Sequence, residues 1–94
     1  MDVTPRLSRW IIANFPAGTS AEILGQLTEL DPGAAGGQNP ERIQAALVLG
    51  TKGSPEAFRQ NLELARTDWR DLLINADLGG TSWPRRLDAV LGPS

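Results

Sequence analysis

The sequence predicts an all-α fold, a compact orthogonal bundle of five or six short helices without a sheet. Helix-start signals recur along the chain, and apolar residues repeat between them at three- and four-residue spacing. No window alternates apolar and polar residues with a period of two, as half-buried strands do. The 94 residues make one helical domain over residues 1–94, in which residues 31–39 form a flexible glycine-rich loop.

The first predicted helix runs from about Pro5 to Phe15. Thr4 supplies the N-cap, Pro5 gives up only an N–H that has no partner in a first turn, and Pro16 ends the helix. Its apolar side chains span an arc of about 200°, twice the stripe of a helix that packs on one core; they are Leu7, Trp10, Ile11, Ile12 and Phe15. Such an arc indicates burial on two sides, or apolar surface left for a partner.

The second predicted helix runs from about Ser20 to Leu30. Thr19 and Glu22 have the spacing of a capping box, which places the N-terminus of this helix at Thr19. Asp31-Pro32 ends it, since proline disfavours the helical conformation of the preceding residue. Its inward face carries Ile23, Leu24, Leu27 and Leu30.

The third predicted helix begins at Asn39-Pro40, an N-cap followed by a proline in the first turn. Gly50 and Gly53 then permit the left-handed turn with which helices often end. One inward face is expected, formed by Ile43, Ala46, Leu47 and Gly50.

Residues 55–78 form either one helix or two. Ser54-Pro55 starts the segment, and one stripe at helical spacing runs through it, made of Phe58, Leu62, Ala65, Trp69, Leu72 and Ala76. Thr67-Asp68 is itself a start signal, a capping threonine followed by an acid, and we therefore favour two helices over one. Gly79-Gly80 ends the segment.

Trp83-Pro84 opens the last predicted helix, and Gly92-Pro93 closes it. Its inward face is expected to consist of Leu87, Val90 and Leu91. All three tryptophans fall at inward or anchoring positions, so packing is their expected role. For Trp10 an alternative stays open, a half-exposed interface residue, because the apolar arc of its helix is wide.

Composition narrows the functional classes. The chain has no His, Cys or Tyr, so the usual nitrogen and sulfur ligands of zinc, copper and iron are missing. We therefore expect no metal, no cofactor and no catalytic residue, and we interpret the protein as not an enzyme. No stretch reaches the ~18 apolar residues of a membrane span, which predicts a cytoplasmic protein without membrane contact. The net charge of −2 weighs against nucleic acid as a partner.

Two short motifs favour structural roles over chemical ones. Gly50-Thr51-Lys52-Gly53-Ser54 lacks the four-residue gap of a phosphate-binding loop and follows a predicted helix instead of a strand. We interpret it as an interhelical turn. Asp68 and Asp71 lie three residues apart, which suits a hard cation, but neighbouring arginines and a helix N-terminus favour charge pairing or capping.

Two segments of the C-terminal half carry a resemblance. Trp69-Arg70-Asp71-Leu72-Leu73, followed by Trp83-Pro84-Arg85-Arg86-Leu87, is similar to small uncharacterised all-helical proteins of GC-rich bacteria. The excess of arginine, with eight arginines to one lysine, fits the codon usage of such a genome. The resemblance implies a bacterial origin and no activity or functional residue.

The leading hypothesis is a small non-catalytic module for protein–protein interaction or regulation, which binds a protein partner or a second copy of itself. It depends on the apolar arc of the first helix and on an arginine stripe opposite the stripe of residues 58–76, although Glu63 interrupts the arginines. The candidate interaction residues are Trp10, Ile12, Arg59, Arg66 and Arg70. Two alternatives stay open: a helix-turn-helix DNA-associated protein, and a non-catalytic subunit of a larger enzyme.

Overall fold

The computed structural model describes residues 2–30 and 39–92. Within these ranges the chain forms five helices and no strand, which confirms the all-α prediction. They are α1 (Pro5–Asn14), α2 (Ala17–Glu29), α3 (Pro40–Val48), α4 (Pro55–Asn75) and α5 (Trp83–Leu91). None of these described helices has the length and apolar character needed to cross a membrane. The predicted flexible loop at 31–39 lies outside the described residues, except for Asn39.

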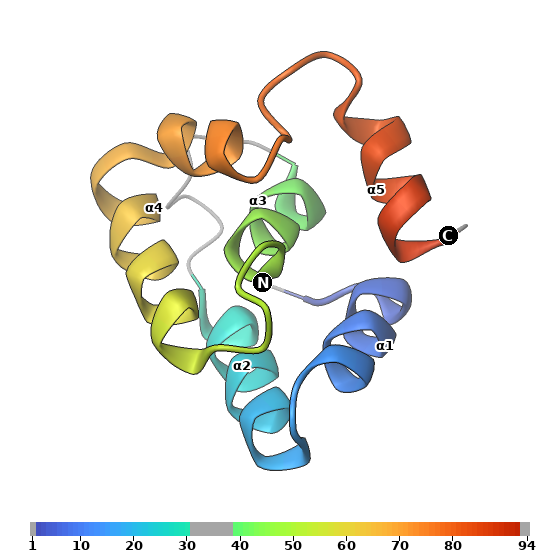
Figure 1. The fold of residues 1–94 in the computed structure, drawn as a ribbon, viewed down its shortest axis with the longest axis vertical. Coiled ribbons are helices and arrows are strands. Elements are labelled where there is room, and N and C mark those ends of the chain that lie inside the picture. Colours follow the sequence, from blue (N-terminus) through green and yellow to red (C-terminus); the bar gives the residue numbers. More distant parts are fainter. Residues whose placement is uncertain (1, 31–38, 93–94) are drawn as a thin grey trace.

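α3 lies at the centre of the bundle (Figure 1), with α1, α4 and α5 packed around it. All six residues from Ile43 to Val48 are buried. Six consecutive residues of a helix point in every direction around its axis, so α3 has neighbours on all sides. The sequence predicted one buried face. It missed the central position because Gln44, Ala45 and Val48 lie off the expected stripe.

α1 begins as predicted, with the Thr4 hydroxyl accepting a hydrogen bond from the N–H of Leu7 at 3.4 Å. Leu7, Ile11 and Phe15 are buried in the core. Ile12 is 59% exposed, so the expectation that α1 is buried on two sides is wrong. The wide apolar arc therefore includes surface residues.

α2 begins at Ala17, three residues before the predicted start, and the predicted capping box at Thr19 is wrong. The N–H of Ser20 donates to the carbonyl of Pro16 at 2.8 Å, and the Ser20 hydroxyl donates to the carbonyl of Ala17 at 3.0 Å. Ser20 is buried. The helix thus gains a first turn that buries Ser20, and only Phe15 and Pro16 remain between α1 and α2.

α4 is kinked at Asp68, whose backbone is non-helical with φ −155° and ψ 86°. The predicted break is therefore real, but the capping residue is Asp68, because its carboxylate accepts hydrogen bonds from the N–H groups of Arg70 and Asp71 at 3.2 and 3.3 Å. Thr67 instead donates its hydroxyl back to carbonyls of the preceding turn. The second half of α4 consequently leaves the first half in a new direction, visible in Figure 1.

α4 ends before Gly79-Gly80, in a Schellman-type turn with an aspartate where glycine is usual. Asp77 has φ 61°. The N–H of Asp77 donates to the carbonyl of Ile74 at 3.0 Å, and the N–H of Leu78 donates to the carbonyl of Leu73 at 2.8 Å. Leu73 and Leu78 are both buried, so their contribution to the core holds the turn.

α5 begins at Trp83 as predicted, and Leu87 is buried. Val90, expected to face inward, is 43% exposed, so that prediction is wrong. α5 lies at the edge of the bundle and packs mainly on α1 and α3 (Figure 1), which cover one side of it.

A buried arginine joins three of the helices. Arg6 on α1 is only 8% exposed. Its guanidinium donates to both carboxylate oxygens of Glu41 on α3, at 2.5 and 2.9 Å. It also donates to the Asp88 carboxylate of α5 at 2.6 Å and to the Gly92 carbonyl at 2.9 Å. Sequence patterns gave no sign of this contact, because the partners lie 35 and 82 residues away along the chain.

We predict that Arg6→Met lowers the free energy of unfolding by about 3 kcal/mol or more, because it leaves the half-buried Glu41 carboxylate without its cation. Arg9→Met on the exposed side of α1 serves as the control and should change stability by less than about 0.5 kcal/mol. Urea denaturation measures both. Adding Glu41→Leu to Arg6→Met should cost less than the sum of the single changes, and strict additivity would contradict the pairing.

A second prediction concerns pH. Hydrogen bonds from Arg6 lower the pKa of Glu41 below its usual 4.5, so the folded state favours the ionised carboxylate. The resulting stabilisation is complete above pH 4.5 and is lost as the pH falls through the lowered pKa. The melting temperature of the wild type should therefore fall more steeply below pH 4.5 than that of Glu41→Gln. Parallel curves for the two proteins would contradict this origin of acid sensitivity.

Candidate functional site

The second half of α4 presents the most exposed large apolar side chain of the described residues. Among the described residues, three large apolar side chains are exposed: Ile12 on α1, Ile74 on α4 and Val90 on α5. Ile74 is the most exposed of the three, at 65%. Ile74 borders a shallow depression of about 290 Å³. We call it the arginine–tryptophan surface, and its lining residues are Arg42, Trp69, Arg70, Leu73, Ile74 and Gly79.

The kink of α4 creates this surface. Residues 69, 70, 73 and 74 follow the Asp68 cap at the spacing i, i+1, i+4 and i+5, which places them along one side of the short second half. Leu73 points into the core, whereas Ile74 beside it reaches solvent. The place of these residues beside Arg42 therefore depends on the change of direction at Asp68.

The turn after α4 completes the surface. Leu78 follows the left-handed Asp77 and brings Gly79 back against Ile74. A Cβ atom at position 79 would lie 3.2 Å from the Ile74 Cγ1 atom and 3.5 Å from its Cα. Glycine therefore allows the returning chain to approach the helix closely. This contact supports Ile74 from one side while most of its side chain stays exposed.

Two guanidiniums rest on two indole rings at this end of the molecule. The Arg70 Cζ atom lies 5.3 Å from the Trp69 ring centroid, and the Arg42 Cζ atom lies 5.1 Å from the Trp83 ring centroid. Both distances are within cation–π range. Arg42 also donates its Nε–H to the Leu78 carbonyl at 2.9 Å, which ties α3 to the turn after α4. The charges are thus held at defined positions beside apolar surface.

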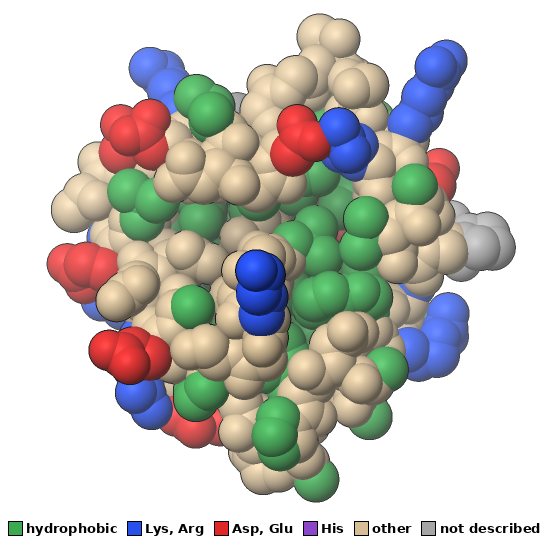
Figure 2. Space-filling view, viewed as in Figure 1, with side chains coloured by type: hydrophobic (Ala, Val, Ile, Leu, Met, Phe, Trp, Pro, Cys, Tyr) green, Lys and Arg blue, Asp and Glu red, His purple; other side chains and the backbone are tan. Residues whose placement is uncertain are grey.

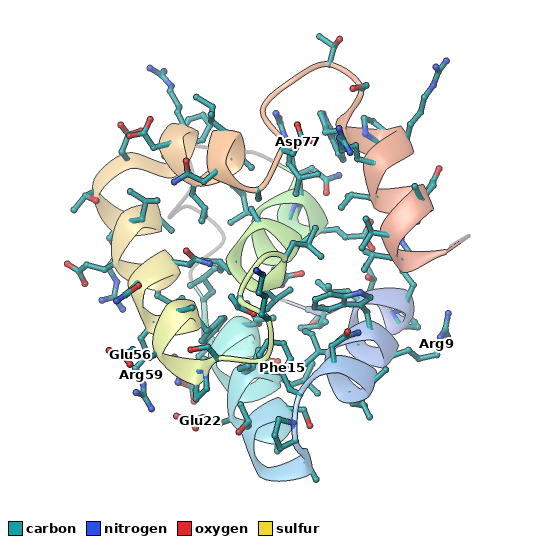
Figure 3. All side chains as sticks on the ribbon, in the orientation of Figure 1. Arg9, Phe15, Glu22, Glu56, Arg59 and Asp77 are labelled. Carbon is teal, nitrogen blue, oxygen red and sulfur yellow. The ribbon has the colours of Figure 1, made fainter. Side chains whose placement is uncertain are left out.

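The lining of this surface carries no carboxylate among the described residues. Two acids nearby are engaged elsewhere, because Asp68 caps the second half of α4 and Asp77 forms an ion pair with Arg86. Asp77 lies between the end of α4 and α5 (Figure 3). The arrangement suits an anionic group next to an apolar one.

The predicted interaction residues do not form one surface. Trp10 and Ile12 are two positions apart and point about 200° apart around α1. Arg66 pairs with Glu63 at 3.6 Å on the first half of α4, and Arg59 lies one turn from Glu56. Figure 3 shows Arg59, Glu56 and Glu22 pointing outward in one corner of the view. Arg70 alone reaches the arginine–tryptophan surface, because the kink separates it from the other two arginines.

Arg42 and Ile74 were not predicted from the sequence. Ile74 had a usable signal, since it is a large aliphatic residue outside the apolar stripe of residues 58–76. Arg42 had none, because its position beside α4 follows from the packing of α3. Trp69 was assigned to the core and is half-buried at the border of the surface.

The two short motifs that were predicted to have structural roles, residues 50–54 and the Asp68/Asp71 pair, lie in structural elements. Residues 50–54 form the turn between α3 and α4, and the Asp68 carboxylate caps a helix. Across the described part of the chain, no three His, Cys, Asp or Glu side chains lie together as a metal site would require.

Comparisons of this chain with protein-family models, with curated proteins and with solved structures returned no match.

The cap at the kink gives a testable prediction. Asp68→Ala should lower the free energy of unfolding by about 1 kcal/mol, because two N–H groups of the second half of α4 lose their acceptor. Asp71→Ala removes an acid of similar exposure that accepts neither bond, and it should cost less. Thermal melts of the two variants measure the difference. Equal losses would contradict the capping role of Asp68.

Proposed function

We propose that this chain is a non-catalytic interaction module that binds an acidic and apolar segment of a partner protein through the arginine–tryptophan surface. The observation that carries the proposal is the exposed Ile74 beside two arginines that rest on tryptophan rings. Trp and Arg, together with Tyr, are enriched among the energetically dominant residues of protein interfaces. This surface concentrates both types around an accessible aliphatic side chain.

The charges indicate the chemistry of the partner. A guanidinium presents a planar set of donors that matches a carboxylate, and such charge-assisted hydrogen bonds are stronger than neutral ones. Arg70 is exposed, and no described carboxylate lines the depression. A partner segment that carries Glu or Asp beside Leu or a similar residue would satisfy both halves of the surface.

Rigidity supports this interpretation. The Asp68 cap, the Schellman-type turn and the bond from Arg42 to the Leu78 carbonyl fix the elements that border the depression. A surface held in position before binding loses less conformational entropy when a partner docks. The depression is small, and contact areas below the usual size of stable complexes are typical of transient partners. We therefore propose a transient interaction with micromolar affinity.

The same arginines are less well suited to binding nucleic acid than to binding a protein segment. Phosphate binding needs clustered positive charge, whereas the chain has a net charge of −2 and places an exposed isoleucine and a tryptophan at this surface. Catalysis also fits poorly, because the groups gathered here are guanidiniums, which hold their protons at neutral pH.

A peptide titration tests the proposal. The probe is a fluorescent amphipathic peptide in which Leu residues recur at three- and four-residue spacing among Glu residues. The control peptide carries Gln in place of every Glu. The acidic peptide should bind in the micromolar range, and the Gln peptide about tenfold more weakly, a difference of about one charge-assisted hydrogen bond. Raising the salt concentration from about 0.05 to 0.5 M should weaken the binding of the acidic peptide and leave the binding of the Gln peptide unchanged.

Matched variants assign the surface. Arg70→Gln and Ile74→Ser should each weaken binding of the acidic peptide by about fivefold or more. Arg66→Gln and Ile12→Ser make the same chemical changes elsewhere and should have no effect. All four sites are exposed, so folding should be retained. Loss of peptide binding in Ile12→Ser would instead assign the interaction to the first helix. If the wild type forms a dimer and Ile74→Ser dissociates it, the surface binds a second copy of the chain. Tighter binding of random duplex DNA than of the acidic peptide would contradict the proposal.

A further inference from the structure

A second depression lies between the end of α1 and the turn that joins α3 to α4, and no residue of the second half of α4 lines it. It has a volume of about 410 Å³ and is lined by Trp10, Asn14, Gly50, Lys52 and Gly53. In the view of Figure 2, hydrophobic side chains gather in a hollow between α1 and this turn, and a basic side chain borders the hollow. None of its lining residues belongs to the arginine–tryptophan surface.

Lys52 occupies an unusual backbone position. Its φ is 53°, in the left-handed region that glycine and asparagine tolerate and that costs other residues conformational free energy. Gly50 and Gly53 on either side also have positive φ, at 81° and 80°. Lys52 is the one lysine of the sequence. Backbone positions of this kind cluster at functional sites, which makes Lys52 a candidate binding residue.

The turn around Lys52 is fixed on both sides. Thr51 is buried, and its hydroxyl donates to the Val48 carbonyl at 2.7 Å. The N–H of Ser54 donates to the Thr51 carbonyl at 3.0 Å. Gly53 packs against α1, since a Cβ at this position would lie 3.4 Å from the Asn14 carbonyl oxygen. These contacts hold Lys52 in its left-handed conformation at the edge of the depression.

The depression is also lined by the indole ring of Trp10, which belongs to α1. Trp10 is half-buried, and its ring forms a T-shaped pair with the ring of Phe15, with centroids 6.4 Å apart and an interplanar angle of 71°. Asn14 donates its side-chain N–H to the Trp10 carbonyl at 2.8 Å, which closes the last turn of α1. The depression is therefore lined by an indole ring from α1 and by the exposed Lys52 from the turn.

We propose that this depression binds a small aromatic carboxylate, with the ring against Trp10 and the carboxylate at the Lys52 ammonium. Aromatic rings pack favourably on an indole, and an ammonium forms charge-assisted hydrogen bonds with a carboxylate. The lining described above contains no acid, so an anion meets no like charge there. The volume of about 410 Å³ lies at the lower end of small-molecule sites and suits one ring with its acid group.

The test is a two-dimensional ¹⁵N NMR titration of the whole chain with phenylacetate, with phenylacetamide as the uncharged match. Phenylacetate should shift the indole N–H of Trp10 and the amides of Gly50, Lys52 and Gly53, and it should bind at least about fivefold tighter than the amide. Lys52→Gly should abolish that preference. It should leave the melting temperature unchanged or higher, because glycine adopts the left-handed conformation without strain. Arg9→Gln, an exposed change on α1 outside the lining, should preserve the preference.

Four outcomes would overturn the proposal. They are no shift at these residues up to ~10 mM phenylacetate, equal binding of acid and amide, an unchanged preference in Lys52→Gly, and shifts centred on Trp69 and Arg70. A fifth outcome, tighter binding of an acetylated tripeptide that ends in phenylalanine, would overturn the assignment to a free small molecule. Because the two depressions share no lining residue, failure here leaves the peptide test of the α4 surface unaffected.

Discussion

The buried guanidinium of Arg6 is the contact on which the arrangement of the bundle depends most. It lies between α1, α3 and α5 and bonds to Glu41, Asp88 and the Gly92 carbonyl. The Thr4 hydroxyl donates to the same Glu41 carboxylate, at 2.5 Å, so the residue that caps α1 also belongs to the network. A charge removed from water is tolerated only when its donors are satisfied, and this requirement fixes all three helices together.

The position of α5 links this network to the candidate surface. α5 packs mainly on α1 and α3, and Arg6 holds it through Asp88. Trp83 at the start of α5 then lies beneath Arg42, which in turn bonds the carbonyl of Leu78 in the turn after α4. The surface near Ile74 is therefore supported by a chain of contacts that begins at Arg6, where α1, α3 and α5 meet. A substitution of Arg6 is expected to disturb this surface, although Arg6 does not line it.

The two depressions share one physical feature, a cationic side chain next to a tryptophan. At the arginine–tryptophan surface, a helical kink and a left-handed aspartate bring them together. At the second depression, a left-handed lysine in a turn lines the same depression as the indole of α1. In both places the backbone adopts a conformation that is uncommon for the residue it carries. Such positions are held by packing and hydrogen bonds around them, and they place side chains where regular helices would not.

The sequence by itself determined the local structure of this protein. Caps and prolines placed the starts of α1, α3, α4 and α5, and the Thr67-Asp68 signal located the kink, because these signals act through hydrogen bonds within a few residues. It erred at α2, where burial of Ser20 added a turn that the capping pattern alone did not favour.

Only the tertiary structure decided which faces are covered and which residues meet. Apolar spacing gives α3 one stripe, yet its place among three helices buries it on all sides, and the same spacing leaves Ile12 and Val90 exposed at the edge of the bundle. The pairs Arg6–Glu41 and Arg42–Trp83 join residues far apart in the chain. Periodicity reports the direction of a side chain relative to its own helix axis. Which helix lies in that direction depends on the packing of the whole chain.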